Sequence, residues 1–166
     1  MGKITTLSAE NMSLGTGNVL AAFRTAAAGS LAALVEVRRV EISQNGSTTS
    51  AQIRGAFSTR DTAGTLTLTS TTPKNISPLG GSASGLSGNT APAGGDGRSG
   101  TNSSADSGGT YTDHYPFNFN NLNGYLWVPT PDERIFVPAS TVWCVRLLAS
   151  PGTTTGWTIC ITLCEE

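Results

Sequence analysis

Three stretches of the chain alternate between apolar and polar residues, which is the pattern of a half-buried β-strand. They are residues 50–58, 65–69 and 157–164, and the last of them is the most regular. Such alternation places the apolar residues on one face of a sheet and the polar residues on the other. Five further segments are expected to form strands: residues 35–43, 115–119, 125–128, 135–137 and 141–148.

Within residues 35–43 the alternation changes phase. The apolar residues occupy odd positions before the Arg38-Arg39 pair and even positions after it. A β-bulge at the arginine pair would keep both halves of the strand facing the core. Asn45-Gly46 follows, and this dipeptide predicts a hairpin-like turn into the next strand.

Residues 19–34 leave two interpretations open. The segment is rich in alanine, which favours a helix, but Gly29-Ser30 interrupts it, so helix and strand remain alternatives. Elsewhere, seven or eight short strands occur without the helical patterns that βαβ units need. We therefore expect an all-β fold, an antiparallel β-sandwich or jelly-roll-like domain, with residues 1–166 forming a single domain.

A low-complexity segment, residues 80–110, separates the strands of the two halves. It holds 10 of the 20 glycines, and its one large aliphatic residue is Leu86. Because it has so little to bury, it is not expected to form a core of its own. Loops of this length inside a domain are uncommon, so the sequence predicts a long Gly/Ser-rich insertion, either mobile or laid as an arm on another surface.

Charge and hydropathy exclude several classes of protein. Ten basic residues oppose eleven acidic ones, and only 13% of residues are charged, so we expect no nucleic-acid partner. No stretch reaches the roughly 18 apolar residues that cross a bilayer, and residues 1–7 lack the apolar core of a signal peptide. We therefore expect a soluble protein without a membrane partner. Cys160 and Cys164 lie too far apart along one strand for a disulfide, which fits reduced thiols.

The candidate catalytic residues do not combine into a catalytic site. The one histidine, His114, follows Asp113, but neighbours in an extended segment point to opposite sides and cannot pair locally. Residues 95–100 match the letters of a dinucleotide-binding loop, but they lack the strand before it and the helix after it. The sequence contains no Gly-x-Ser-x-Gly pattern. We expect no enzyme activity, no cofactor and no small-molecule substrate.

Metal-ligating residues are also sparse. One histidine and scattered thiols do not supply the three or four ligands of a zinc site. Asp96, Asp106 and Asp113 could bind calcium, but their spacing fits no twelve-residue calcium loop. We expect no metal.

Several segments resemble small virion proteins of tailed phages. They are residues 37–46, VRRVEISQNG; residues 51–57; residues 122–138, LNGYLWVPTPDERIFVP; and the tryptophan strand with the acidic end Cys164-Glu165-Glu166. Together they are similar to capsid decoration or cement proteins, including those of cyanophages. The resemblance leaves residues 80–110 and the first thirty residues outside it.

The resemblance implies a function as well as a fold. It implies a jelly-roll-like domain, assembled as a homotrimer on the outer surface of an icosahedral virion, with the major capsid protein as partner. The protein would be made in the cytoplasm of the bacterial host. Candidate interface residues are Arg98 in the insertion and Tyr111, His114 and Tyr115 directly after it.

Residues 127–138 are open to a purely structural interpretation. Pro129 and Pro131 end a strand because they remove amide donors, and Asp132-Glu133 is a polar turn before the next strand. A hairpin with an aromatic core residue accounts for this pattern, so no site is assigned there. The alternative function is a carbohydrate- or receptor-binding domain of a phage tail or fibre.

In that alternative, exposed aromatic residues would stack on sugars. The candidates for such stacking are Tyr111, Tyr115 and Tyr125. A decoration protein would be present in near-stoichiometric amounts with the major capsid protein. A fibre protein would be present in few copies and would bind cells.

Overall fold

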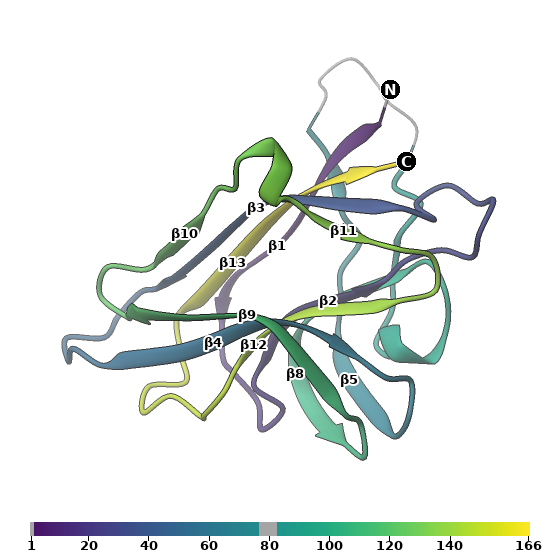
Figure 1. Cartoon of the computed structure of the whole chain (residues 1–166). Coiled ribbons are helices and arrows are strands. Elements are labelled where there is room, and N and C mark those ends of the chain that lie inside the picture. The colour runs from purple at the N-terminus through teal and green to yellow at the C-terminus, as the bar shows by residue number, and fades with distance from the viewer. Residues whose placement is uncertain (1, 77–82) are drawn as a thin grey trace.

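Strands form most of the described part of the chain, residues 2–76 and 83–166 of a computed structural model (Figure 1). The strands are β1 (Lys3–Met12), β2 (Val19–Arg24), β3 (Val35–Gln44), β4 (Gln52–Arg60), β5 (Thr65–Ser70), β6 (Lys74–Asn75), β7 (Ser87–Gly88), β8 (Arg98–Ser107), β9 (Tyr111–Asn120), β10 (Tyr125–Trp127), β11 (Ile135–Val137), β12 (Val142–Leu147) and β13 (Trp157–Glu165). Two short 3-10 helices, η1 (Pro92–Gly94) and η2 (Pro131–Glu133), lie between them.

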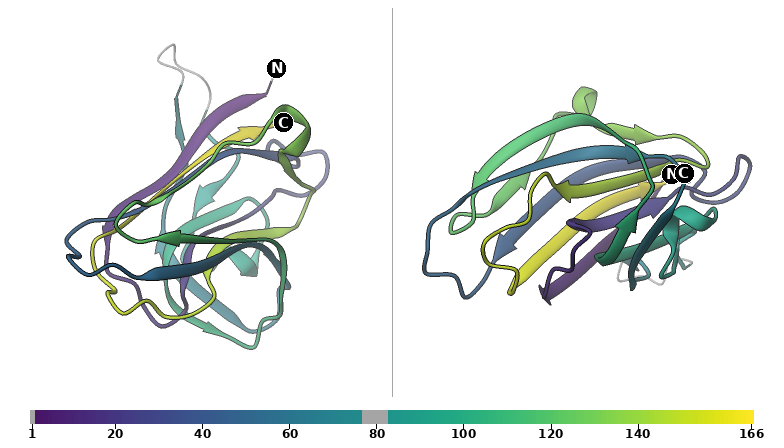
Figure 2. Two further views of the ribbon diagram at one scale, coloured as in Figure 1. Left: turned by 60° about the vertical axis from the view of Figure 1, so that its left-hand side comes forward. Right: turned by 90° about the horizontal axis from the view of Figure 1, so that it is seen from below.

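The strands form two sheets that pack as two layers (Figures 1 and 2). Sheet A has the order β10-β3-β13-β1-β6, and β11 also pairs with β3. Sheet B has the order β5-β8-β2-β12-β4-β9, and β7 also pairs with β8. The pairings are antiparallel except that of β7 with β8. The predicted all-β, antiparallel sandwich is confirmed.

The main core lies between the inner faces of the two sheets. Sheet A contributes the apolar set of β13, and sheet B contributes large side chains such as Trp143 and Phe57. Phe57 is surrounded by aromatic rings from both sheets, among them Trp127 at 5.1 Å and Trp143 at 5.6 Å between centroids. Such a cluster combines a large buried area with favourable ring geometry, so it stabilises the packing of one sheet on the other.

A second, smaller core lies on the other face of sheet B. Successive residues of a strand point to opposite faces, so Trp143 enters the main core while Val142 and Cys144 enter the second. Leu66 and Leu68 of β5 cover this face, although β5 is not a neighbour of β12 in the sheet. Sheet B therefore curls until β5 and β8 lie over its own outer face.

The strands predicted from alternation are confirmed. Residues 50–58, 65–69 and 157–164 lie largely within β4, β5 and β13. The predicted bulge in β3 is also present, because Thr162 pairs with Arg39 whereas Leu163 pairs with Val37, which leaves Arg38 unmatched. Both halves of β3 thereby keep their apolar residues in the core.

The open choice for residues 19–34 is resolved in two parts. Residues 19–24 form β2, and the remainder is irregular. In β2, Ala21 and Phe23 face the main core, whereas Val19 and Ala22 face the second core. A strand buried on both faces shows a continuous apolar run, which is why alternation is not visible here.

The hairpin-like turn predicted at Asn45-Gly46 is wrong. β3 belongs to sheet A and β4 to sheet B, so the loop of residues 45–51 crosses between the sheets. The reason is that both edges of β3 are already paired. At its end, Ile42 lies opposite Ile159 of β13 on one side and opposite Tyr125 of β10 on the other.

A loop or arm was predicted over residues 80–110, and this is wrong for residues 98–107, which form strand β8. Residues 80–82 of that prediction lie outside the described residues. β8 pairs with both β5 and β2 inside sheet B. Its inward positions Ser99, Thr101 and Ser103 are buried hydroxyl residues rather than apolar ones. Their hydroxyls form hydrogen bonds, as when Ser103 Oγ accepts from the Val19 amide at 2.9 Å, so burial leaves them satisfied.

Residues 84–86 of this segment are also held in place. The buried carboxylate of Glu165 accepts hydrogen bonds from Thr5 Oγ1 at 2.7 Å, Ser84 Oγ at 2.5 Å and the Gly85 amide at 2.7 Å. Leu86 then enters the main core with no exposed surface. The described part of the insertion is thus paired with sheet B through β7 and β8 and joined to sheet A through the Glu165 carboxylate.

The hairpin interpretation of residues 127–138 is also wrong. β10 and β11 do not pair with each other in the described structure, since both pair with β3, Trp127 opposite Val40 and Ile135 opposite Val37. They are two pieces of one edge strand, interrupted by residues 128–134. The interruption follows from Pro129 and Pro131, because proline offers no amide hydrogen for a ladder.

Candidate interaction surface

The four interface residues singled out from the sequence do not form one surface. Arg98 lies at the start of β8, where its guanidinium packs beside Gly95. Tyr111, His114 and Tyr115 lie along β9, which pairs with β4 at the edge of sheet B. The fold therefore separates Arg98 from the other three, and those three have different surroundings.

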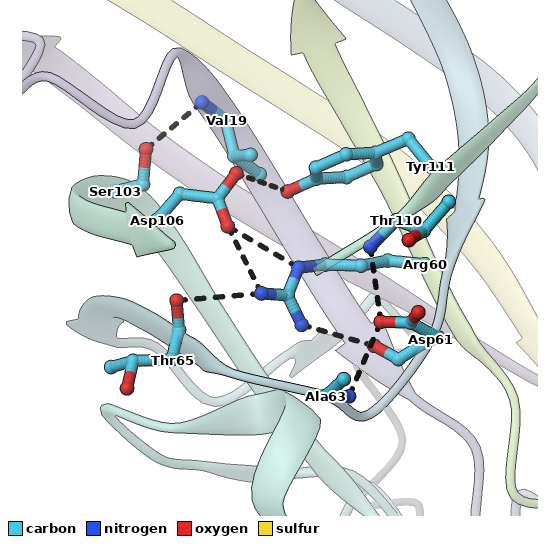
Figure 3. A network of polar contacts seen from close by, with 9 residues as sticks. All are labelled: Val19, Arg60, Asp61, Ala63, Thr65, Ser103, Asp106, Thr110 and Tyr111. Atoms are coloured by element: carbon cyan, nitrogen blue, oxygen red, sulfur yellow. Dashed lines mark hydrogen bonds and ion pairs between the residues drawn. The ribbon is translucent and has the colours of Figure 1, made fainter. Parts of the chain in front are cut away.

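Tyr111 takes part in a network of hydrogen bonds and an ion pair inside the curl of sheet B (Figure 3). Its hydroxyl donates a hydrogen bond of 2.7 Å to Asp106 Oδ2, and Asp106 Oδ1 accepts from Arg60 Nη2 at 3.0 Å. The guanidinium of Arg146 lies 4.3 Å from the centroid of the Tyr111 ring, a cation–π distance. Burial, followed by the bond to Asp106, raises the pKa of Tyr111 far above its ordinary value. Tyr111 is thus a structural residue that links three strands.

Asp113 and His114 have separate partners. Asp113 accepts from Ser58 Oγ at 2.6 Å and from Arg146 Nη2 at 2.8 Å. Burial alone would raise the pKa of Asp113, but the hydrogen bonds of Ser58 and Arg146, and then the charge of Arg146, lower it below its usual value. His114 instead shares a hydrogen bond of 2.8 Å with Thr59. The two neighbours therefore do not form an acid–base pair.

Tyr115 is the exposed aromatic residue of β9, with 44% of its surface open to solvent. Its ring stacks on Phe57 at 5.5 Å and meets Trp127 at 6.0 Å. It therefore closes the gap between the edges of the two sheets at this point.

A hollow of about 330 Å³ lies between β11 and sheet B, where the sandwich edge is less well filled. It is lined by Thr59, His114, Ile135, Phe136, Val137, Pro138, Thr141 and Trp143. This lining is mostly apolar, and its volume is at the lower end of the range for small-ligand pockets. His114 contributes one of its few polar groups.

Exposed apolar side chains also occur along and next to this edge strand, and one of them, Phe136, lines the hollow as well. Of the eight exposed large hydrophobic residues in the described chain, four lie within residues 122–138. They are Leu122, Leu126, Val128 and Phe136, which we call the β10–β11 surface. Leu126 and Phe136 are 58% and 55% exposed. Four exposed apolar residues within one 17-residue segment make this edge a candidate interaction surface.

Ion pairs flank the β10–β11 surface. Phe136 lies opposite Glu36, whose carboxylate binds Arg38 at 2.6 Å and Arg134 at 2.9 Å. Burial by itself would raise the pKa of Glu36, but the hydrogen bonds and charges of Arg134 and Arg38 outweigh it and lower that pKa. Leu126 lies opposite Glu41, which pairs with Arg39 at 2.7 Å.

A second hollow, of about 310 Å³, adjoins Leu126. Its lining includes Glu41, Ser43, Thr158 and Cys160 on the outer face of sheet A. The β10–β11 surface thus combines exposed apolar side chains, a bordering recess and balanced charges. An apolar centre with a polar rim is the usual composition of a protein interface.

The described residues offer little reactive chemistry. Burial raises the pKa of the Cys144 thiol to about 12, and it also raises the pKa of Cys160 and Cys164, so none of the three is a ready thiolate. Within residues 2–76 and 83–166, no three His, Cys, Asp or Glu side chains come together as metal ligands. Over the same residues, no helix has the length and apolar character to cross a membrane.

Comparison of the chain with protein families, with curated proteins and with solved structures found no match. The β10–β11 surface was not assigned as a site from the sequence. The available signal was the pair of continuous apolar runs, Leu126-Trp127-Val128 and Ile135-Phe136-Val137. In a strand with one solvated face, such runs must place an apolar residue outward.

Proposed function

We propose that this protein is a virion structural protein that decorates the outer surface of an icosahedral phage capsid and binds the major capsid protein through the β10–β11 surface. One observation carries the proposal. Residues 122–138, which resemble decoration proteins, also hold four of the eight exposed large hydrophobic residues of the described chain. Exposed apolar side chains of this kind become buried when a partner protein covers them.

The chemistry of the β10–β11 surface suits adhesion to a protein. Burying apolar surface contributes about 25 cal/mol per Å², and a few well-buried anchors usually dominate binding. The exposed side chains of Leu126 and Phe136 are the candidate anchors. The Arg39–Glu41 pair and the Glu36 cluster would form the polar rim, which selects the partner more than it adds affinity.

Binding to capsids lacking the protein tests this proposal. In co-sedimentation with such capsids, we expect near-stoichiometric binding of the unaltered chain, and Leu126→Ser and Phe136→Ser each to weaken it at least about tenfold. The matched control is Leu31→Ser, because Leu31 is 50% exposed but lies outside the β10–β11 surface. Unchanged affinity in both test variants, or equal loss in the control, would refute the role of this surface.

We further propose that the protein acts as a homotrimer. Linking three copies on a repeating lattice multiplies a weak single contact, provided that all three can engage at once. Light scattering at micromolar concentration should then give a mass three times the 17.1 kDa of one chain. A mass equal to that of one chain would exclude the trimer and leave the capsid contact to be tested separately.

The alternative is a carbohydrate- or receptor-binding domain of a tail or fibre. Two of the three tyrosines expected to stack on sugars already contact other side chains of the fold. Tyr111 donates a hydrogen bond to Asp106, and Tyr125 stacks on Phe117 at 4.2 Å between ring centroids. The hollow beside His114 is the observation that still favours it. Few copies per particle together with binding to host cells would support this alternative against the capsid role.

A further inference from the structure

Three places in the described chain have an asparagine or aspartate directly before a glycine. They are Asn45-Gly46, Asp96-Gly97 and Asn123-Gly124. At such a site the glycine amide nitrogen can attack the preceding side-chain carbonyl carbon, because glycine has no Cβ to obstruct the approach. The attack requires an accessible amide nitrogen and freedom of the backbone to move.

The surroundings of Gly46 permit this attack. Asn45 and Gly46 are both exposed, in the loop that crosses from β3 to β4. No acceptor in the described chain receives a hydrogen bond from the Gly46 amide. The space beside the Gly46 Cα is open, with nothing within 4 Å of the position that a Cβ would take.

The surroundings of Gly124 oppose the same attack. Its amide donates to the Asn120 carbonyl oxygen at 3.1 Å, so that bond must break before the nitrogen can react. The Ile42 carbonyl oxygen lies 2.8 Å from the position of a Cβ on Gly124, which shows how closely β3 packs against this turn. The Asn123 amide also donates to Asn120, so both residues of the pair are fixed.

Asp96-Gly97 is fixed as well. The Gly97 amide donates to the Thr25 carbonyl oxygen at 3.3 Å. The Asp96 carboxylate pairs with Arg24 at 2.7 Å and accepts from Ser140 Oγ at 3.0 Å. The glycine amide is therefore hydrogen-bonded at two of the three sites. At the third site the Asn45 amide donates to the Gly156 carbonyl oxygen at 2.8 Å, but the attacking Gly46 nitrogen has no such bond in the described chain.

We infer that Asn45 is a site of spontaneous deamidation in the folded protein. The Gly46 nitrogen forms a bond to Asn45 Cγ, loses its proton, and the side-chain nitrogen leaves as ammonia, which yields a five-membered succinimide. Water then adds to one of the two ring carbonyls and opens the ring. The product is aspartate when water attacks Cγ and the bond from Cγ to the Gly46 nitrogen breaks. It is isoaspartate when water attacks the backbone carbonyl carbon and the original peptide bond breaks instead.

The product changes the loop that joins the two sheets. One neutral amide becomes a carboxylate, so the formal net charge of −1 becomes −2. Isoaspartate also lengthens the backbone by one carbon, directly after the Asn45 amide that donates to the Gly156 carbonyl oxygen at 2.8 Å. Protein that has aged would therefore carry an altered and more acidic loop at this end of the sandwich.

Ageing of the full chain under native conditions tests the inference. Samples are incubated at mildly alkaline pH, digested, and assayed for isoaspartate with isoaspartyl methyltransferase and for the amide-to-acid mass change. We expect modification at Asn45, faster at higher pH because the attacking nitrogen must lose its proton. Modification at Asn123 should be about tenfold slower, since one hydrogen bond must first break.

Two controls separate the fold from the sequence. Asn45→Gln should abolish the main label, while Asn123→Gln should leave it almost unchanged. In concentrated urea the two Asn-Gly pairs should react at similar rates, because the hydrogen bond at Gly124 is lost. Equal rates at the two sites in the folded chain, faster reaction at Asn123, or no reaction at Asn45 would each overturn the inference.

Discussion

The Arg60→Met variant is expected to lose about 3–5 kcal/mol of unfolding free energy, the usual cost of removing one partner of a buried ion pair. The Arg60 side chain has no exposed surface, and it binds Asp106 at 3.0 Å as well as the carbonyl oxygens of Asp61 and Thr65. Methionine retains much of the volume but leaves the Asp106 carboxylate with the Tyr111 hydroxyl as its one remaining partner among the described residues. Urea unfolding followed by circular dichroism measures the loss.

Two further variants show whether burial is the cause. Arg39→Met removes an exposed ion pair, with 46% and 44% of the Arg39 and Glu41 side chains open to solvent, and should cost less than about 1 kcal/mol. The double variant Arg60→Met with Asp106→Leu should recover part of the loss, because no uncompensated charge stays buried. Equal destabilisation by the Arg39 and Arg60 variants would show that the network does not hold the curl of sheet B.

The second large effect is expected at Phe57. Phe57→Ala should cost about 3–5 kcal/mol, because it leaves a cavity among aromatic rings from both sheets. Trp127 lies 5.1 Å from Phe57 on the sheet A side, and Phe117 lies 5.0 Å away on the sheet B side. The same unfolding titration measures it, and near-ultraviolet circular dichroism should show loosened aromatic packing.

Two other variants provide comparisons for the stability loss of Phe57→Ala. Phe57→Leu retains most of the apolar volume and should cost clearly less than Phe57→Ala. Phe136→Ala removes a phenylalanine that is 55% exposed, and should change stability by about 0.5 kcal/mol or less. If Phe57→Ala were as mild as Phe136→Ala, the aromatic cluster would not be what joins the two sheets.

The fold was predictable where burial follows the simple alternation of apolar and polar side chains. β13 and β5 show that alternation, and the phase change at Arg38-Arg39 marked a real bulge. β8 was not predicted as a strand because its buried residues Ser99, Thr101 and Ser103 carry hydroxyl groups instead of apolar side chains. A polar side chain can be buried only where tertiary partners form hydrogen bonds with it. Those partners come from distant segments, so no local pattern reveals them.

The candidate site was less predictable for a related reason. Tyr111 looks like an exposed aromatic residue in the sequence, but the curl of sheet B brings Asp106 and Arg60 around it. Conversely, Phe136 looks like a core residue and is exposed, because β11 is an edge strand whose outer face nothing covers in the described chain. Both errors concern which elements become neighbours, a property of topology rather than of local sequence.

The place of β13 in sheet A has a consequence for biosynthesis. β13 lies between β3 and β1, and Lys3 lies opposite Glu165. During translation, β1 leaves the ribosome long before its main partner, so its amides and carbonyls stay solvated until residues 157–165 emerge. Sheet A therefore closes only after residues 157–165 have emerged, and pairing of this kind over long sequence separations makes folding slow. For that interval the unpaired edge of β1 is exposed, which favours aggregation of nascent chains.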